Sequence, residues 1–468
     1  MILLWQKNNP TKPKRKNNPG KIVRGDGPEA ADRSPGPGAI TVVAVLLMLA
    51  QACPLFGAEV SGKFSSLFQS RENKDGDRES VLDNYLSLDA DRILHPAVSM
   101  HAYGKYGHDF DANFSDTSLY YGYLEYRTHE GRADIKLGRF PLSTHRFLTV
   151  DGMNVSLKPD GPVGVAVFGG ASKYLDLDPD RFKRLFSTSE GTIYGGRLFL
   201  QGVEGTRAYA GYSREGSGDT VYQELFSGGA GRDFQAILLG KELKISADGS
   251  ADYNPDRAAM EKMSARLFTS FDKKLRVLLE ADLYDVQNEF PEGRELVLSI
   301  LSDGRERRTF YTVFYDLNPN VAIYQSSVFT SLKMPDGGWQ TGTILKGGVS
   351  GNFIEPMGLD LDLGIYRFES FIADATGISS RIRWRPHNKW ILEGGLEAVS
   401  IDTPSHHDQT ATTISGEVGY RPKPTLKAAL FVEQSDNPEF RSDFRTGMRL
   451  DYDFSFPAGR NFPAGEGR

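Results

Sequence analysis

The sequence contains no apolar run long enough to cross a bilayer as a helix. Among its 468 residues, no window of about 18 or more consecutive apolar residues exists, so no helical span is indicated. Hydrophobic residues make up 39% of the chain, which is low for a chain of this length with one packed core. The fold must therefore be one that does not depend on a single large apolar interior.

Cysteine is nearly absent. Cys53 is the only one, and it precedes the point where we expect a leader to be removed. A mature chain without cysteine excludes disulfides, thiolate metal sites, cysteine nucleophiles and haem attachment through C-x-x-C-H. Ala50-Gln51-Ala52-Cys53 faintly resembles a lipoprotein site, but the leucine usual at the third position before the cysteine is missing. We do not expect lipidation.

Motifs for catalysis, nucleotide binding and metal binding are also missing. The chain has no G-x-x-x-x-G-K and no G-x-S-x-G sequence. Dispersed Ser, His and Asp residues could form a triad, as in membrane-barrel hydrolases, but no local motif supports one. His406-His407-Asp408 lies in a predicted outer loop, where adjacent histidines more simply face solvent than bind a metal. We expect no enzyme, no metal and no cofactor.

The first 58 residues are typical of a leader. Residues 1–38 are rich in Lys, Arg, Pro and Gly, a short apolar stretch runs from Ala39 to Ala50, and the small residue Ala58 follows. This order indicates a secretory signal peptide with a long basic extension, for which a misassigned start codon is one explanation. The alternative, an uncleaved anchor, is disfavoured because the apolar stretch is short and Pro54 interrupts the region.

Removing the leader makes the chain strongly acidic. Residues 1–58 hold eight Lys or Arg and three Asp or Glu, which leaves 47 basic and 58 acidic residues and a net charge of −11. A nucleic-acid binder would show a basic face instead, so we expect no nucleic-acid partner.

What the sequence has in quantity is alternation of period two. Gly131–Gly170 contains three candidate strands and no room for a helix, and three valines of Val163–Phe168 share one face. Similar segments, separated by turn residues, recur from residue 59 to residue 456. Alternation of this kind is typical of a transmembrane antiparallel up-and-down β-barrel, which has a lipid-facing apolar side and a polar interior. The fold is therefore predicted to be all-β.

The alternation assigns charged residues to the barrel interior, since a charge at mid-bilayer costs about 2–4 kcal/mol. In Leu275–Tyr284 every odd position is apolar, and the even positions are Arg, Leu, Glu, Asp and Tyr. The residues that parity places on the lumen wall, where rings of charge set ion selectivity, are Arg197, Arg207, Arg276, Glu280, Asp282, Asp360, Asp362, Arg381, Arg383, Arg385, Glu393, Glu397, Glu417, Glu433 and Arg449. The simpler interpretation is that a water-filled wall must be polar.

The hairpin Ser380–Ala398 allows a pairing to be predicted. With a three-residue turn at His387-Asn388-Lys389, Arg383 falls opposite Glu393 and Arg385 opposite Ile391. Opposite charges on facing strands stabilise a pair by about 0.2–1 kcal/mol. We therefore expect an Arg/Glu ladder on the lumen wall.

The last alternating segment resembles the C-terminal insertion signal of Gram-negative outer-membrane barrels. The positions that carry the resemblance are Arg445, Gly447, Leu450, Tyr452, Phe454 and Phe456. The sequence departs from the pattern by continuing from Pro457 to Arg468, where such chains usually stop at the aromatic residue. The resemblance implies the barrel-assembly machinery and outer-membrane lipid as partners.

Turn positions give a strand count of about 22, within a range of 18–22. Both termini are assigned to the periplasm, which puts the short connections inside and the long ones, Tyr174–Glu190, Gln287–Thr309, Ser400–Ala411 and Ser435–Asp443, outside. The count of 22 requires Asp233–Tyr253 to be one long strand. The chain thus divides into a leader (1–58), a barrel (59–456) and a tail (457–468).

A second resemblance involves Leu137-Gly138-Arg139-Phe140, then Asp151-Gly152-Met153, then the valine strand. This order is similar to porin-type outer-membrane channels, although the likeness is diffuse over residues 59–456. It implies a channel in the Gram-negative outer membrane and names no solute. Parity puts Arg139 on the lipid face, so we expect the strand to end there with Arg139 at the rim; the alternative is a bulge that turns it inward.

Two functions follow from these observations. The first is a porin-like channel for passive passage of small hydrophilic solutes or ions. The second is a sheath that encloses a periplasmic or lumenal partner, such as a multihaem cytochrome of an electron conduit. Wide barrels need filling, so 16–18 strands favour the porin and 20 or more favour the sheath. Loops that fold inward, such as 291–308 with its helical-looking Glu295–Leu298, would favour a porin with a constriction.

The leader predicts the N-terminus of the mature protein. Cleavage after Ala58 leaves Glu59 as the first residue, which N-terminal sequencing and intact-mass measurement of protein from membranes will detect. A mature protein that retains residues 39–58 would contradict a cleaved signal peptide.

Overall fold

The computed structural model describes the barrel region of the chain. The residues described are 58–72, 78–93, 95–128, 130–142, 148–173, 175–178, 183–186, 191–200, 203–218, 220–285, 305–334, 337–354, 358–370, 373–403, 406–437 and 442–456. The predicted leader and tail, and most of the segment 291–308, lie outside these residues. No helix within the described residues is long and apolar enough to cross a membrane.

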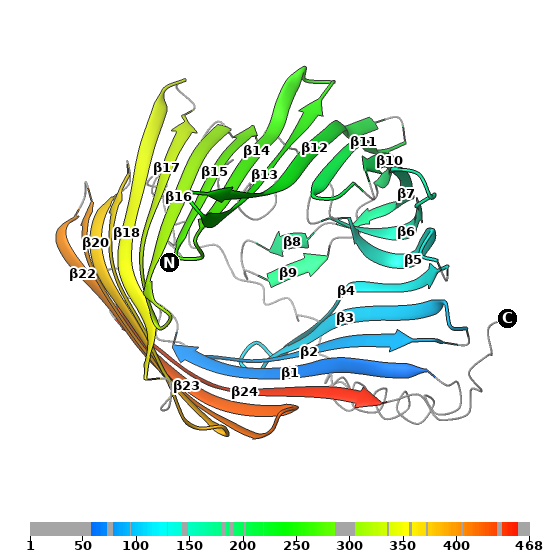
Figure 1. Cartoon of the computed structure of the whole chain (residues 1–468). Coiled ribbons are helices and arrows are strands. Elements are labelled where there is room, and N and C mark those ends of the chain that lie inside the picture. Colours follow the sequence, from blue (N-terminus) through cyan, green and yellow to red (C-terminus); the bar gives the residue numbers. More distant parts are fainter. Residues whose placement is uncertain are drawn as a thin grey trace, which may run out of the picture.

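The described residues form one closed ring of 22 antiparallel strands (Figure 1). Consecutive strands pair as hairpins, and β1 pairs with β24 from Val60↔Phe456 to Arg71↔Arg445. No strand edge of the ring is left open, as a bilayer requires of a sheet. The all-β, up-and-down barrel and the predicted count of 22 are confirmed.

The ring strands and their bounds are β1 (Glu59–Glu72), β2 (Arg78–Asp91), β3 (Val98–Asp109), β4 (Phe114–Arg127), β5 (Ala133–Leu142), β6 (Leu148–Leu157), β7 (Val163–Lys173), β10 (Thr192–Leu200), β11 (Thr206–Ser217), β12 (Thr220–Leu238), β13 (Lys241–Asn254), β14 (Ala259–Phe271), β15 (Leu275–Asp285), β16 (Arg305–Asn318), β17 (Val321–Lys333), β18 (Trp339–Ile354), β19 (Leu359–Glu369), β20 (Asp374–His387), β21 (Trp390–Thr403), β22 (His406–Lys423), β23 (Leu426–Asp436) and β24 (Asp443–Phe456). A separate hairpin of β8 (Leu175–Asp178) and β9 (Lys183–Phe186) joins β7 to β10. In Figure 1, β8 and β9 lie within the ring.

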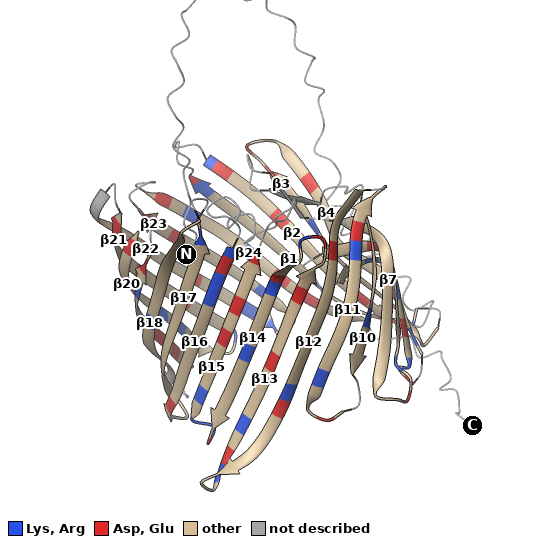
Figure 2. Cartoon of the chain, turned by 90° about the horizontal axis from the view of Figure 1, so that it is seen from above, with Lys and Arg blue, Asp and Glu red and all other residues tan. Residues whose placement is uncertain are grey.

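The two faces of the ring differ as the alternation predicts. Large apolar side chains such as Leu137, Val167, Leu198 and Leu430 are exposed on one face, Leu137 to 57%. The ion pairs of β15, β16 and β20 to β24 lie on the other face, and charged segments recur along β13 to β16 in Figure 2. An apolar outer face on a closed sheet matches a barrel that contacts hydrocarbon.

The longest connections lie at one end of the barrel. Because Val60 pairs with Phe456, β1 begins and β24 ends at the same end. Two-residue turns at 239–240, 319–320 and 388–389 lie at that end, whereas the long connections after β7 and β15 lie at the other, where the β11–β12 and β21–β22 connections are as short. Long loops mark the outer end of such barrels, so the termini belong to the periplasmic end.

The segment Asp233–Tyr253 is not one strand, as the sequence analysis required, but two. β12 ends at Leu238 and β13 begins at Lys241, with positive φ at both turn residues, Leu239 (53°) and Gly240 (75°). This backbone geometry makes a tight hairpin, for which Gly240 is suited but Leu239 is not, so the sequence carries only half of the turn signal. The long connection after β7 nevertheless stays at the end opposite the termini.

The β12–β13 hairpin also extends beyond its neighbour. The β11–β12 pairing begins only at Thr206↔Arg232, so Asp233–Leu238 pairs with β13 alone. Its tip is apolar and open, with Ile237 82% and Leu239 87% exposed. This tip lies at the periplasmic end (Figure 2).

The connection predicted over Ser400–Ala411 is also much shorter than expected. β21 continues to Thr403 and β22 begins at His406, so His406, His407 and Asp408 belong to a strand and not to a loop. Thr403 and His406 are paired after a bulge, which interrupts the alternation that the sequence analysis relied on.

Closure of the ring at β1 and β24 is testable because the mature chain is expected to have no cysteine. Ser61 and Ser455 are direct partners, and such pairs lie within disulfide distance. A Ser61→Cys/Ser455→Cys variant should form an intramolecular disulfide on oxidation, seen as a mobility change on non-reducing gels. A Ser61→Cys/Ser435→Cys control, whose second position lies on β23, should not. Failure of the first pair to crosslink would contradict the closed register.

Candidate functional site: the lumen wall

The first network of charged residues on the lumen wall lies on β14 to β16. Arg308 forms an ion pair with Asp282, whose side chain is almost fully buried, and donates to Glu280 at 3.4 Å. Arg266 reaches the other oxygen of Glu280 at 3.3 Å, and Arg276 donates to Asp316 at 2.8 Å. Each of the predicted residues Arg276, Glu280 and Asp282 is therefore part of a cross-strand ion pair.

The ladder predicted on β20 and β21 is present at its first rung. Arg383 faces Glu393 across the strands and donates through Nε to Oε1 at 2.8 Å. Arg381 donates to Oε2 of the same carboxylate at 2.9 Å. One carboxylate thus holds two guanidinium groups on neighbouring positions of one face.

Arg385, however, is not opposite Ile391. The pairing of β20 and β21 shifts between Trp384 and His387, and the turn contains two residues instead of three. A bulge of this kind adds a residue to one strand and re-aims the side chains beyond it. Arg385 instead lies 3.4 Å from Asp360 on β19.

A second network joins β22, β23 and β24. Glu417 accepts from Lys427 at 2.9 Å and from Arg449 at 3.2 Å. Arg449 also lies 3.3 Å from Asp451, which accepts from Ser65 across the β1–β24 closure at 2.7 Å. The network therefore spans the junction where the ring closes.

Tyrosine hydroxyl groups donate hydrogen bonds to two of the remaining predicted carboxylates. Glu397 accepts from Tyr366 at 2.5 Å and Asp362 accepts from Tyr324 at 3.3 Å. Glu433 lies 3.4 Å from Arg445. The wall from β14 to β24 is thus dense in charge. Of the predicted residues on it named above, all but Glu397 and Asp362 lie beside a side chain of opposite charge.

Arg197 and Arg207 have different surroundings. Arg197 on β10 stacks over the rings of Phe199 and Tyr209, 5.4 and 5.7 Å from their centroids. Arg207 on β11 donates to Asp233 at 3.3 Å, near the periplasmic end. The structure does not bring these two arginines into the networks of β14 to β24.

Arg139 does not end its strand, as the sequence analysis expected. β5 continues to Leu142, and the pairing of β5 with β4 and β6 shows no shift at Arg139. The side chain stays on the face of Leu137, where it donates to both oxygens of Asp151, at 2.6 and 2.8 Å, and to the carbonyl of Leu119 at 2.8 Å. A neighbouring carboxylate, not the rim, accommodates this charge.

The insertion-signal residues lie in β24. Gly447 faces Phe431, and a Cβ at Gly447 would lie 2.4 Å from the Phe431 ring and 2.3 Å from the Phe68 carbonyl. Only glycine fits there. Leu450, Tyr452, Phe454 and Phe456 alternate with the charged positions, and Phe454 is buried beside Val60 and Leu88.

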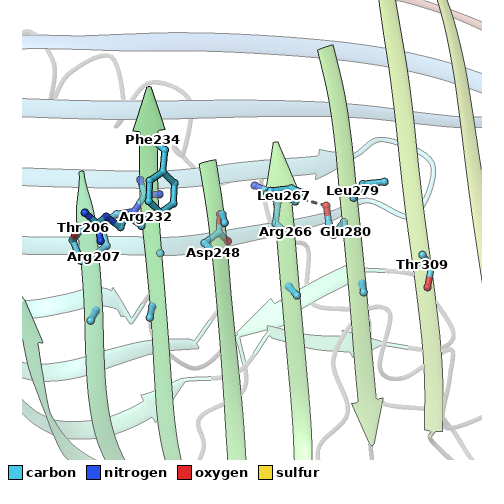
Figure 3. Close-up of a pocket in the computed structure, with 16 residues that line it drawn as sticks. Thr206, Arg207, Arg232, Phe234, Asp248, Arg266, Leu267, Leu279, Glu280 and Thr309 are labelled. Atoms are coloured by element: carbon cyan, nitrogen blue, oxygen red, sulfur yellow. Dashed lines mark hydrogen bonds and ion pairs between the residues drawn. The ribbon is translucent and has the colours of Figure 1, made fainter. Parts of the chain in front are cut away.

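A cavity also opens over β11 to β16, where small residues meet across neighbouring strands (Figure 3). Ala208 pairs with Ala230, and Ala265 with Ala281. These positions share the face of Leu267 and Leu279, which is the apolar outer face. The cavity is a depression on the lipid-facing side of the wall and is not part of the lumen.

The opposite side of the lumen, from β2 to β10, combines further ion pairs with aromatic and apolar side chains. Phe140, Leu142, Leu148, Val150 and Ile193 form a buried cluster on the inward face, with Phe140 and Val150 0% exposed. Tyr123 and Phe168 pack against it. Sequence reasoning noted aromatic-rich strands here but did not identify them as a site.

His101 is held among carboxylates beside this cluster. Its Nδ1 lies 2.6 Å from Asp89, and its Nε2 lies 3.1 Å from Ser99 Oγ and 3.3 Å from Glu125. Asp, His and Ser in this order resemble a hydrolase relay. Glu125 occupies the nitrogen that would have to serve as the base, so the geometry favours an ion-pair network. Within the described residues, no three His, Cys, Asp or Glu side chains are grouped as metal ligands.

Comparison with known proteins gives distant structural matches only. No family model matches the sequence, and no curated protein matches it. OpdK of Pseudomonas aeruginosa, solved with vanillate, shares 10% identity at a TM-score of 0.42, covering 85% of this chain and 99% of its own. OccAB2 of Acinetobacter baumannii shares 10% identity at a TM-score of 0.42, covering 85% of this chain and 98% of its own. A BenF-like porin from Pseudomonas fluorescens Pf-5 shares 10% identity at a TM-score of 0.40, covering 85% of this chain and 99% of its own.

Matches of this strength assign no residue role, so the geometry of this chain decides its class. A closed antiparallel ring, an apolar outer face, a charged inner wall and short turns at the end of both termini occur together. The chain has the fold of a Gram-negative outer-membrane β-barrel. Outer-membrane lipid therefore surrounds its apolar face.

The contact between Arg383 and Glu393 has a measurable energy. A double-mutant cycle of Arg383→Ala and Glu393→Ala should give a coupling of about 0.2–1 kcal/mol in the free energy of unfolding, because the pair is partly exposed to water. Urea unfolding in lipid vesicles measures it. The matched cycle of Arg383→Ala with Glu433→Ala on β23 should be additive. A coupling as large in the control would show that the effect is not due to the contact.

Proposed function

We propose that this barrel is a passive channel for small hydrophilic solutes or ions. The observation that carries the proposal is the inner wall from β14 to β24, where rows of ion pairs line a closed ring. Such a wall is compatible with water, and its charges would be costly in a dry interior. If no solute passed through a ring of this width, some other structure would have to fill its lumen.

The strand count taken alone favours a filled barrel, since 22-stranded barrels are wide enough to hold a plug. Two observations support filling by the chain itself. The β8–β9 hairpin lies within the ring in Figure 1, and the inward-facing Phe140 and Val150 have no exposed surface. We therefore infer a channel whose lumen is narrowed on the side of β5 to β10.

The ion pairs also bear on selectivity. Four arginines of the wall each lie within 3.5 Å of a carboxylate oxygen, namely Arg276, Arg308, Arg383 and Arg449. The positive charges and the carboxylates are therefore paired with one another. Paired charges present little net field to a passing ion. We propose weak charge selectivity, set by the lumen's shape more than by a ring of one sign.

Insertion by the barrel-assembly machinery belongs to the same proposal. The final strand carries the alternating aromatic pattern, and Gly447 provides the space that the Phe431 ring fills. A bulky residue at Gly447 would separate β24 from β1 and β23, the two strands that complete the ring.

A second function, the sheath around a partner, is favoured by one specific observation. The β12–β13 hairpin projects at the periplasmic end with Ile237 and Leu239 exposed, which is unusual for apolar side chains outside a membrane. A periplasmic cytochrome or other partner docked at this end would cover them. Affinity purification from native membranes with haem staining tests this candidate, and purification of the barrel alone would exclude a stable partner.

Channel function predicts conductance. Purified barrel reconstituted into planar bilayers should give discrete current steps in KCl, with a reversal potential close to zero under a tenfold salt gradient because the wall charges are paired. Bilayers that receive the same preparation after unfolding in urea are the control. Folded protein that inserts and passes no current would exclude the channel and leave the sheath.

A further inference from the structure

Five tyrosines gather on the lumen side of β2, β3 and β4. Tyr103 lies at the centre, with Tyr85 on β2 and Tyr120, Tyr121 and Tyr123 on β4. All five side chains are partly exposed and none is fully buried. We call these residues the tyrosine patch.

The rings of the patch are close and several are nearly parallel. The Tyr103 ring centroid lies 5.0 Å from that of Tyr120 at an interplanar angle of 24°, and 6.4 Å from that of Tyr85 at 17°. Tyr121 follows at 5.7 Å from Tyr103, and Tyr123 at 6.0 Å from Tyr121. The register of β3 and β4 shifts between Tyr103 and Gly104, where β4 has one extra residue, Tyr120, and both Tyr120 and Tyr121 lie against Tyr103.

Polar and charged groups of both signs border the rings. Lys105 lies 5.8 Å from the Tyr85 ring centroid and forms an ion pair with Asp83 at 2.9 Å. Lys136 lies 5.2 Å from the Tyr123 ring centroid, beside Glu125. The border therefore offers both donors and acceptors without an excess of positive charge.

A third carboxylate, Asp116, lies near Lys105 and Tyr120. Its Oδ1 is buried, and a Cβ at Gly107 would lie 3.2 Å from it and 3.0 Å from Asp83 Oδ1. The carboxylates of Asp83, Asp116 and Glu125 outnumber the ammonium groups of Lys105 and Lys136. A ligand carboxylate would therefore be repelled here.

We propose that the tyrosine patch binds the rings of a neutral saccharide. The proposal rests on the channel function above and names its solute class. A pyranose presents C–H groups on its faces, which pack on aromatic rings, and hydroxyl groups on its rim, which pair with donors and acceptors around them. The patch has both features, and the three carboxylates at its border, against two ammonium groups, disfavour an aromatic carboxylate.

Ion current in planar bilayers tests the proposal. Maltotriose should block the current reversibly and in a saturable manner, while sorbitol, an acyclic polyol, should not at the same hydroxyl concentration. The Tyr103→Ala variant should weaken the maltotriose block about tenfold, because the central ring is lost. Tyr103→Phe keeps the ring and should retain the block.

A control variant and a competing probe separate the outcomes. Tyr420→Ala removes a tyrosine of β22 that packs on Trp390 on the outer face, outside the patch and the lumen, and should leave the maltotriose block unchanged. Conductance that benzoate blocks and maltotriose does not would overturn the saccharide, as would equal loss of block in Tyr103→Ala and Tyr420→Ala. An absence of conductance in all variants would instead refute the channel itself.

Discussion

Satisfaction of the backbone hydrogen bonds is the constraint on which the rest of this structure depends. A sheet in hydrocarbon cannot leave an edge open, so the first strand must meet the last. Here β1 pairs with β24 over Val60–Arg71, and the ion pair of Lys63 with Asp451 crosses the same junction. Closure fixes the strand register, and the register then decides which side chains face each other. The lumen networks are consequences of closure, not its cause.

Once the register is fixed, the charged side chains form ion pairs with the residues opposite them on the neighbouring strands. Glu393 takes two arginines because Arg381 and Arg383 are two positions apart on one face. The same principle acts outside the lumen, where Arg139 remains on the lipid-facing side because Asp151 is its direct partner. A charge on the apolar face of a strand therefore does not by itself mark a rim, and the neighbouring strand has to be known.

The sequence predicted what depends on period two and missed what breaks it. The faces of β15 and the pairing of Arg383 with Glu393 follow from alternation and turn residues. The count of 22 agrees with the structure although it assumed one strand over Asp233–Tyr253, which is two. The split was missed because only Gly240 signals a turn there, and Leu239 gives no sign of its left-handed backbone. The positions of Arg385 and Tyr120 depend on bulges, which shift parity without a residue preference of their own. The tyrosine patch was missed for this reason, although its residues lay in strands that had been recognised as aromatic.

The two sides of the lumen make different demands on a solute. From β14 to β24 the wall offers paired charges, which favour water and bind no particular ion strongly. From β2 to β10 it adds apolar and ring surfaces, beside Phe140 and Val150, to ion pairs such as that of Lys105 with Asp83. A solute with apolar ring faces and hydroxyl groups would contact both kinds of surface on this side, whereas a simple ion would contact only the charges. The aromatic surface therefore distinguishes this side of the lumen and favours a solute with two kinds of surface.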